Sequence, residues 1–203
     1  MNKLINEGQK PQKGKKAAIM IHGRGASAKS ILSLKSYLKL DDFALMAPQA
    51  PGGTWYPYSF MAPDHSNQPA LDQSLSQIKE AFDSLLTEGV EPSDIFLIGF
   101  SQGACLSLEF AARNAQKLGG VVAFTGGLIG EQIIRDNYQG DFEGTPVLIS
   151  GSQQDMHVPL ERMKESGILL TKQGANVKLL SFPDSAHTIR QEEIDWVNQH
   201  ILG

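Results

Sequence analysis

Residues 94–103 read DIFLIGFSQG, and this stretch decides the fold. The apolar run Ile95–Ile98, which follows Asp94, is too short for a helix and predicts a buried strand, while residues 102–117 predict a helix. Glycines stand two positions before and two positions after Ser101, where they leave space for a sharp turn. We therefore expect a strand–turn–helix unit with Ser101 at the turn, in strained backbone geometry.

Short apolar runs and amphipathic stretches alternate along the rest of the chain. Further strands are predicted at Ala17–Ile21, Phe43–Met46, Gly120–Phe124, Pro146–Ser150 and Val177–Ser181. Helical spacing relates Ile31, Leu34 and Leu38; Leu71, Leu75, Ile78, Phe82 and Leu85; and Ile194, Val197 and Ile201. Strands that are apolar on both faces and separated by helices belong in a covered parallel sheet. The sequence predicts a three-layer α/β fold, a mostly parallel central sheet with helices on both faces.

Composition limits the class of protein. Of 203 residues, 41% are hydrophobic and 20% charged, which predicts a single globular domain over residues 1–203. Residues 1–16 form a polar segment with a basic cluster between Lys10 and Lys16, which predicts a solvated tail; a binding patch is the alternative. The net charge of −4 gives no reason to expect nucleic acid. No apolar run approaches the ~18 residues of a membrane helix and no signal peptide is recognisable, so we expect a cytoplasmic protein without membrane insertion.

Three residues that suit one chemistry follow three separate predicted strands, where ligands bind in sheets of this kind. Ser101 follows the first, and a serine hydroxyl becomes a nucleophile when a histidine takes its proton. Asp155 lies one loop beyond Pro146–Ser150, and His187 lies in the loop after Val177–Ser181. The chain order Ser, Asp, His predicts a catalytic triad of nucleophile, orienting carboxylate and base.

Other residues of the same types are weaker candidates for these roles. Asp184 lies three residues before His187 and follows no strand of its own, and His65, His157 and His200 lack a strand-end position. Taken singly, Ser101 also fits a helix-capping turn, Asp155 a loop turn and His187 a surface loop. Cys105, the single cysteine, excludes an internal disulfide and a Cys-based metal site, and we interpret it as core packing.

A tetrahedral intermediate would need hydrogen-bond donors for its oxyanion. We assign these donors to the backbone N–H of Gln102, directly after Ser101, and to the N–H of Arg24 in the glycine-rich segment after the first predicted strand. That segment also fits a turn into a helix capped by Ser27 or Ser30, and both interpretations can hold together.

A loop rich in aromatic residues and proline is the candidate substrate wall. Its members are Trp55, Tyr56, Tyr58, Phe60 and Met61. Aromatic side chains near strand ends suit an apolar acyl or alcohol pocket, although each of them could instead pack the loop onto the sheet. The pattern leaves open whether residues 52–68 close over a substrate or stay fixed.

Four segments together resemble the phospholipase/carboxylesterase family of α/β-hydrolases. They are His22-Gly23-Arg24-Gly25, Gly99-Phe100-Ser101-Gln102-Gly103, Asp155-Met156-His157-Val158-Pro159 and Ser185-Ala186-His187. The resemblance runs from about Ala17 to the last helix. It implies an α/β-hydrolase fold, carboxylesterase or acyl-protein thioesterase activity without metal or organic cofactor, and for Ser101, His187, Asp155, Arg24 and Gln102 the roles given above.

The chain departs from this family at two positions. Ala104 stands where members often have a second glycine, which is sterically mild. Arg24 stands where members often have leucine, and it would place a guanidinium at the mouth of the site. Our hypothesis is that Arg24 favours substrates that bear a carboxylate, with a side chain directed into water as the alternative.

We expect a serine hydrolase, a carboxylic ester hydrolase that cleaves small-molecule esters through an acyl-enzyme. Within the enzyme class, the alternative is a long-chain acyl thioesterase or lysophospholipase, which would need an extended apolar channel. From another class, the alternative is a non-catalytic ligand-binding protein on the same scaffold, which predicts a broken triad. The sequence leaves the oligomeric state open, with a homodimer among the outcomes.

Overall fold

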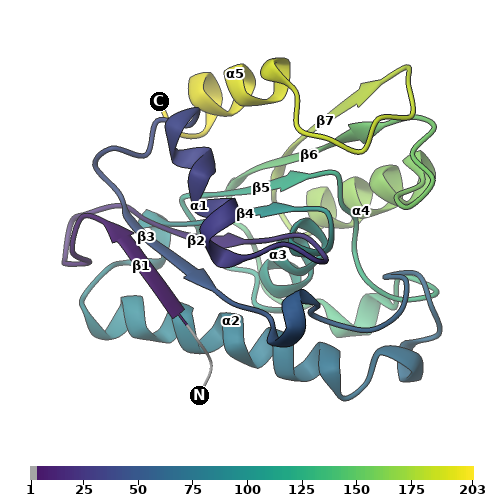
Figure 1. Cartoon of the computed structure of the whole chain (residues 1–203), viewed down its shortest axis with the longest axis horizontal. Helices are drawn as coiled ribbons and strands as arrows, with labels where there is room; N and C mark the ends of the chain where they lie inside the picture. Colours follow the sequence, from purple (N-terminus) through teal and green to yellow (C-terminus); the bar gives the residue numbers. More distant parts are fainter. Residues whose placement is uncertain (1–3) are drawn as a thin grey trace.

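The computed structural model describes residues 4–203, which contain one seven-stranded sheet of order β1-β3-β2-β4-β5-β6-β7 (Figure 1). The strands are β1 (Leu4–Gly8), β2 (Ala17–Ile21), β3 (Ala44–Pro48), β4 (Ile95–Phe100), β5 (Gly120–Phe124), β6 (Pro146–Ser152) and β7 (Asn176–Phe182). β1 pairs antiparallel with β3, and all other neighbours pair in parallel.

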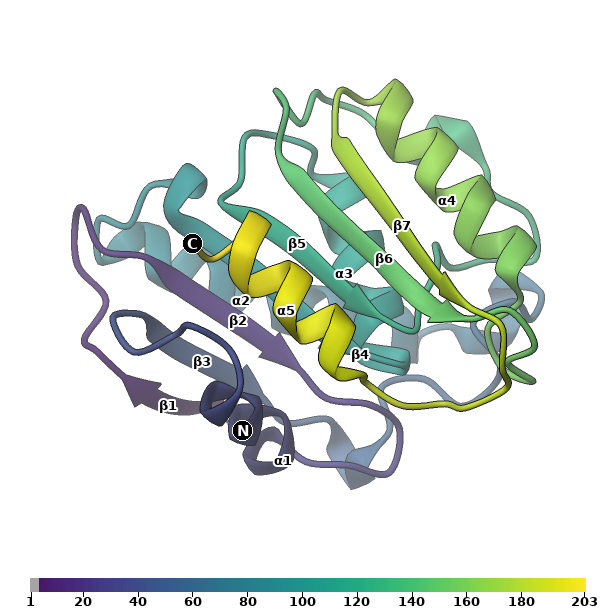
Figure 2. The ribbon, with the colours of Figure 1, turned by 90° about the horizontal axis from the view of Figure 1, so that it is seen from above.

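Helices cover both faces of this sheet. The α-helices are α1 (Ala28–Leu32), α2 (Ala70–Thr87), α3 (Gln102–Arg113), α4 (Leu160–Lys172) and α5 (Gln191–His200), and the short 3-10 helices are Ser33–Ser36, Pro51–Gly53, Asp64–Asn67, Pro92–Asp94 and Arg135–Asn137. Figure 2 shows α1 and α5 on one face and α2, α3 and α4 on the other.

Side chains that alternate along each strand pack into two apolar cores, one on each face of the sheet. In β2, Ala17, Ile19 and Ile21 join the core under α2, α3 and α4, whereas Ala18 and Met20 join the core under α1 and α5. A strand buried on both sides must be apolar throughout, which is why these strands read as continuous hydrophobic runs. The prediction of a three-layer, mostly parallel α/β fold is confirmed.

Four of the predicted strands, β3, β4, β6 and β7, are longer in the structure. β4 and β6 each run two residues further than their apolar runs suggest, because backbone pairing continues through Gly99 and Phe100 to β5 and through Gly151 and Ser152 to β7. Pairing with a neighbouring strand needs no apolar side chain, so the hydrophobic pattern ends before the strand does.

The helix after Ser101 is shorter than predicted. α3 ends at Arg113, where the Asn114 side chain donates to the Phe110 carbonyl at 2.8 Å, and not at Lys117.

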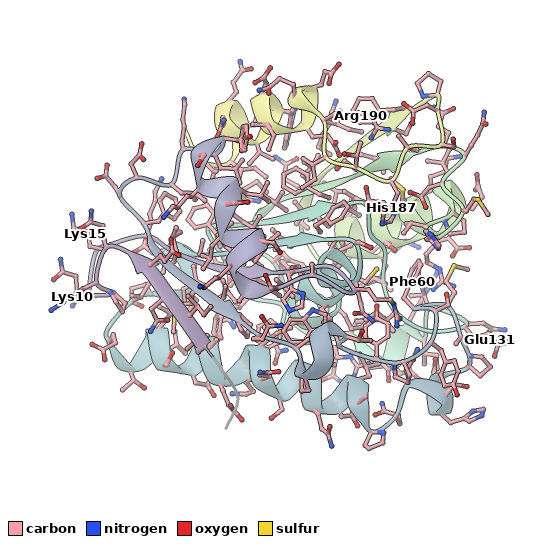
Figure 3. The ribbon with its side chains drawn as sticks, viewed as in Figure 1. Lys10, Lys15, Phe60, Glu131, His187 and Arg190 are labelled. Atoms are coloured by element: carbon pink, nitrogen blue, oxygen red, sulfur yellow. The ribbon has the colours of Figure 1, made fainter. Side chains whose placement is uncertain are left out.

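The prediction of a solvated tail is wrong for residues 4–8, which form β1. Because β1 is the edge strand beyond β3, it needs no continuous apolar run, and the tail interpretation missed it. Lys10, Lys13, Lys15 and Lys16 lie exposed in the connection between β1 and β2. Figure 3 labels Lys10 and Lys15 there. α4 was not predicted either, since Gly167 and polar residues interrupt its buried positions Met163, Leu169 and Leu170.

The parallel strands end at one common edge of the sheet. The loops that carry Ser101, Asp155 and His187 follow β4, β6 and β7 there. Within residues 4–203, no helix is both long and apolar enough to cross a membrane.

Candidate active site

Ser101 occupies a strained turn between β4 and α3. Its φ of 55° and ψ of −119° lie outside the regions that a residue with a side chain favours. The turn is held by a bond from Ser101 N–H to the Phe124 carbonyl (2.9 Å) and by a bond from Cys105 N–H to the Ser101 carbonyl (3.0 Å). Strain maintained by surrounding structure exposes the hydroxyl at the edge of the sheet.

The two glycines around Ser101 are both required by close backbone contacts. A Cβ at Gly99 would collide with the backbone of Gly103, and a Cβ at Gly103 would collide with the carbonyls of Ile21 and His22. The turn therefore has the glycine geometry that the sequence predicts.

The structure brings Ser101, His187 and Asp155 into one hydrogen-bonded chain. His187 Nε2 lies 2.8 Å from Ser101 Oγ, and His187 Nδ1 lies 2.7 Å from Asp155 Oδ2. The other carboxylate oxygen, Oδ1, accepts from the backbone N–H groups of His157 (2.7 Å) and Val158 (3.0 Å). A carboxylate bound in this way orients the imidazole and leaves Nε2 facing the serine.

Asp155 is buried yet remains a good anion. Burial alone would raise its pKa, but hydrogen bonds from His157 N–H, the His187 ring and Val158 N–H outweigh it, so its pKa lies below its ordinary value. The carboxylate is thus charged at neutral pH, as stabilisation of an imidazolium requires.

Asp184, the competing carboxylate, lies in a different hydrogen-bond network. Its Oδ1 accepts from Ser152 Oγ (2.7 Å) and from Ala186 N–H (3.0 Å), and it forms an ion pair with Arg190. Arg190 also donates to Ser152 Oγ at 2.6 Å and stacks over Phe182. Arg190 lies above His187 in the view of Figure 3. The network ties the loop that carries His187 to the end of β6, a supporting role that sequence reasoning did not identify.

His22 holds the loop in front of Ser101 and was also missed as a functional residue. Its ring is buried, with Nδ1 2.7 Å from the Gly23 carbonyl and Nε2 3.1 Å from the Ala50 N–H. Because a carbonyl only accepts and an amide N–H only donates, the proton sits on Nδ1 and the ring is neutral. Burial lowers the pKa of His22 and keeps it in this form.

We expect this histidine to make stability depend on pH. Between the lowered folded-state pKa and the unfolded value near 6.5, the unfolded chain binds the extra proton, so stability falls as the pH drops through that window. Relative to His22→Gln, which cannot titrate, the wild type should lose unfolding free energy below about pH 6.5, at up to about 1.4 kcal/mol per pH unit. Urea denaturation of both proteins between pH 5 and pH 8 measures this difference. A constant difference across that range would contradict the assignment.

The two proposed oxyanion donors belong to two segments that meet at Ser101. Gln102 is the first residue of α3, so its N–H has no carbonyl partner within the helix and lies at the positive end of the helix dipole. Arg24 follows Gly23, where a Cβ would stand only 3.4 Å from Ser101 Cβ. The segment is held by other amides, since Gly25 N–H donates to Gly53 O and Ala26 N–H donates to Gly23 O. Ser27 caps α1 as the sequence predicts.

A cleft of about 600 Å³ opens in front of Ser101. Its lining residues are Arg24, Tyr56, Pro57, Tyr58, Ser59, Phe60, Ser101, Gln102, Cys105, Met156, His157, Val158 and His187. Figure 3 shows Phe60 and His187 at the same end of the molecule. Tyr56, Tyr58 and Phe60 thus line the cleft as predicted. Met156, which is 92% exposed, and Val158 were missed, although they adjoin Asp155 in the sequence.

The assignment of Trp55 and Met61 to the substrate wall is wrong for this cleft. Trp55 is only 2% exposed; its indole N–H donates to the His22 carbonyl at 2.8 Å and its ring packs on the His22 ring. Met61 packs against the core on the α2 side of the sheet. In both cases the alternative interpretation, packing of the loop onto the sheet, describes the side chain.

The aromatic loop is anchored at several points. The Gln102 side chain accepts from Trp55 N–H (3.0 Å) and donates to the Tyr56 carbonyl (2.8 Å). Asn67 accepts from Tyr58 N–H at 2.9 Å and donates to the Ser59 carbonyl at 2.8 Å. These bonds tie residues 55–59 to α3 and to Asn67.

Buried Cys105 also lines the cleft, where its side chain is hydrogen-bonded with that of Tyr56. Burial raises the pKa of its thiol to about 12, and the thiol is therefore protonated at neutral pH. A protonated, buried thiol is a poor nucleophile, in agreement with its interpretation as packing.

The sheet topology and the strained Ser101 turn define an α/β-hydrolase. A family model described as phospholipase/carboxylesterase matches residues 2–202, so the chain belongs to this family, a family of carboxylic ester hydrolases.

Individual proteins that are similar to this chain carry names from the same family. The chain is 48% identical in sequence to a phospholipase/carboxylesterase from Dyadobacter fermentans whose crystal structure is known. The two structures superpose with a TM-score of 0.98, over 100% of this chain and 97% of that one. Acyl-protein thioesterase 1 of Debaryomyces hansenii is 30% identical over 89% of this chain and 87% of its own length. A probable carboxylesterase of Oryza sativa subsp. japonica is 23% identical over 90% of this chain and 77% of its own length.

Proposed function

We propose that this protein hydrolyses small carboxylic esters through an acyl-enzyme formed on Ser101. The observation that carries the proposal is the continuous chain of hydrogen bonds from Ser101 Oγ through His187 to Asp155, next to a cleft large enough for a small ester. The intact triad argues against a non-catalytic binding protein.

The proposed reaction has two halves with the same groups. His187 Nε2 takes the proton from Ser101 Oγ as the oxygen bonds to the ester carbon, and the carbonyl electron pair moves to an oxyanion held by the N–H groups of Arg24 and Gln102. Collapse of this intermediate expels the alcohol, which takes the proton from His187. Water then attacks the acyl-enzyme by the same route and releases the acid and Ser101. Asp155 stabilises the cationic His187 in both halves.

A fluorophosphonate probe tests the nucleophile directly. The probe should label the wild-type protein with one equivalent, and peptide mass spectrometry should find the phosphonyl group on Ser101. Prior incubation with a small ester should slow labelling, because both compounds occupy the same cleft. Absence of labelling, or labelling of another residue, would overturn the proposal.

The mixed lining of the cleft supports short substrates over long acyl chains, because polar Arg24, Gln102 and His157 stand among its aromatic residues. A long-chain thioesterase or lysophospholipase would need an extended apolar channel, whereas buried Tyr56 and Cys105 line this cleft among polar groups. We expect kcat/KM for ethyl esters to be highest with acyl groups of a few carbons. A steady rise towards long acyl chains, measured on one series with a constant alcohol, would favour the alternative suggested by the acyl-protein thioesterase relatives. A cytoplasmic location remains a prediction.

A further inference from the structure

Arg24 contributes a fixed positive charge to the cleft. Its Nη1 donates to the Pro57 carbonyl at 2.9 Å and its Nη2 donates to the Tyr58 carbonyl at 2.6 Å. The guanidinium carbon also lies 6.0 Å from the centre of the Tyr56 ring. These contacts exclude the alternative of a side chain that only extends into water, and they hold the guanidinium on the wall that Tyr56 and Tyr58 form.

This charge is not neutralised by the protein. Both partners of the guanidinium are neutral carbonyls, and among residues 4–203 no carboxylate lies within ion-pair distance of Arg24. Two of its five N–H groups are used, so three donors remain. A guanidinium prepared in this way can bind a carboxylate with little further loss of side-chain entropy.

The rest of the cleft offers no negative charge that would repel an anion. Within the described part of the chain, neither Asp nor Glu lines it, and its other titratable groups are Tyr56, Tyr58, Cys105, His157 and His187. Asp155 is buried behind His187. The net charge of −4 is carried elsewhere, and at physiological salt it is screened beyond about 8 Å. The positive charge of Arg24 therefore decides whether the cleft attracts or repels an ion.

From these observations we infer that the preferred substrates are short esters that carry a carboxylate, with that carboxylate bound by Arg24. The inference rests on the proposed esterase function and specifies its substrate class. Arg24 carries both the charge and a proposed oxyanion N–H, so the carboxylate lies within a few carbons of the ester carbonyl. Monoesters of short dicarboxylic acids have this structure.

The test compares two esters that differ only in the group at the end of the acyl chain. Monoethyl glutarate and ethyl valerate share the alcohol and the length of the acyl chain, but only the first ends in a carboxylate. The wild type should show the higher kcat/KM for monoethyl glutarate, mainly through KM. Arg24→Gln should lower the ratio of the two kcat/KM values by about 10- to 100-fold, and Arg24→Lys should lower it less. Because Arg24 is exposed, the wild-type ratio should also fall as salt is raised.

A control separates charge from loop anchoring. Asn67 holds the same loop through Tyr58 and Ser59 without a charge in the cleft, so Asn67→Ala should change both esters by the same factor. In a second pair, 3-acetoxypropanoate and propyl acetate, the carboxylate is on the alcohol side of the ester. A larger effect of Arg24→Gln on this pair would assign the carboxylate to the leaving group and would overturn the inference that the substrates are monoesters of dicarboxylic acids.

An equal loss on both glutarate-series esters in Arg24→Gln would overturn the inference while leaving the esterase function intact. No hydrolysis of either ester together with no fluorophosphonate label would instead defeat the proposed function itself.

Discussion

Replacement of Ser101 by alanine should lower kcat/KM for ethyl valerate by about 10⁶-fold, because the variant loses the atom that attacks the ester carbon. The loss would not come from unfolding. Within the described residues the Ser101 side chain makes no capping bond to α3, and alanine keeps the same Cβ in the same strained turn. Circular dichroism and thermal unfolding should therefore match the wild type while ester hydrolysis, followed by pH-stat titration, is abolished.

Ser107→Ala is the matched control for this substitution. Ser107 lies on the same helix and donates to the Gly103 carbonyl at 2.9 Å, and its hydroxyl takes no part in the hydrogen bonds that join Ser101, His187 and Asp155. This variant should keep most of its activity. A loss of less than about 100-fold in Ser101→Ala would show that another group is the nucleophile.

Asp155→Asn should lower kcat by about 10⁴-fold through the proton position on His187. In the wild type, Oδ1 of Asp155 accepts from the His157 and Val158 N–H groups. The carbonyl oxygen of an asparagine would take that place, because only an oxygen can accept there, and its NH2 group would face His187 Nδ1. The imidazole would then carry its proton on Nε2 and could not take the proton of Ser101.

Asp184→Asn separates this electrostatic role from support of the histidine loop. Asp184 contacts Ser152, Ala186 and Arg190 and makes no bond to His187 within residues 4–203, so its substitution should cost no more than about tenfold in kcat. Proton NMR in the low-field region should show the His187 Nδ1–H signal in the wild type and in Asp184→Asn and its loss in Asp155→Asn. Equal losses of kcat in the two variants would contradict the separate roles.

Local sequence pattern predicts most of the fold because each element's own residues encode it. The buried strands carry continuous apolar runs, and the glycines around Ser101 mark the turn because backbone contacts there leave no space for a Cβ. Ser101, Asp155 and His187 could be selected together because the ends of parallel strands meet at one edge. β1 escaped prediction since an edge strand needs fewer apolar residues, and α4 since Gly167 interrupts its pattern.

The sequence by itself determined the fold class, the strained turn at Ser101 and the three residue types that meet there. Only the tertiary structure decided which aromatic side chains line the cleft, since Trp55 and Tyr56 are neighbours in the chain and differ in what they pack against. It also decided that Arg24 binds carbonyls more than 30 residues away, at Pro57 and Tyr58. Hydrophobic periodicity indicates which side chains avoid water. These contacts depend instead on how segments that are distant in the sequence approach each other, and no local pattern indicates that.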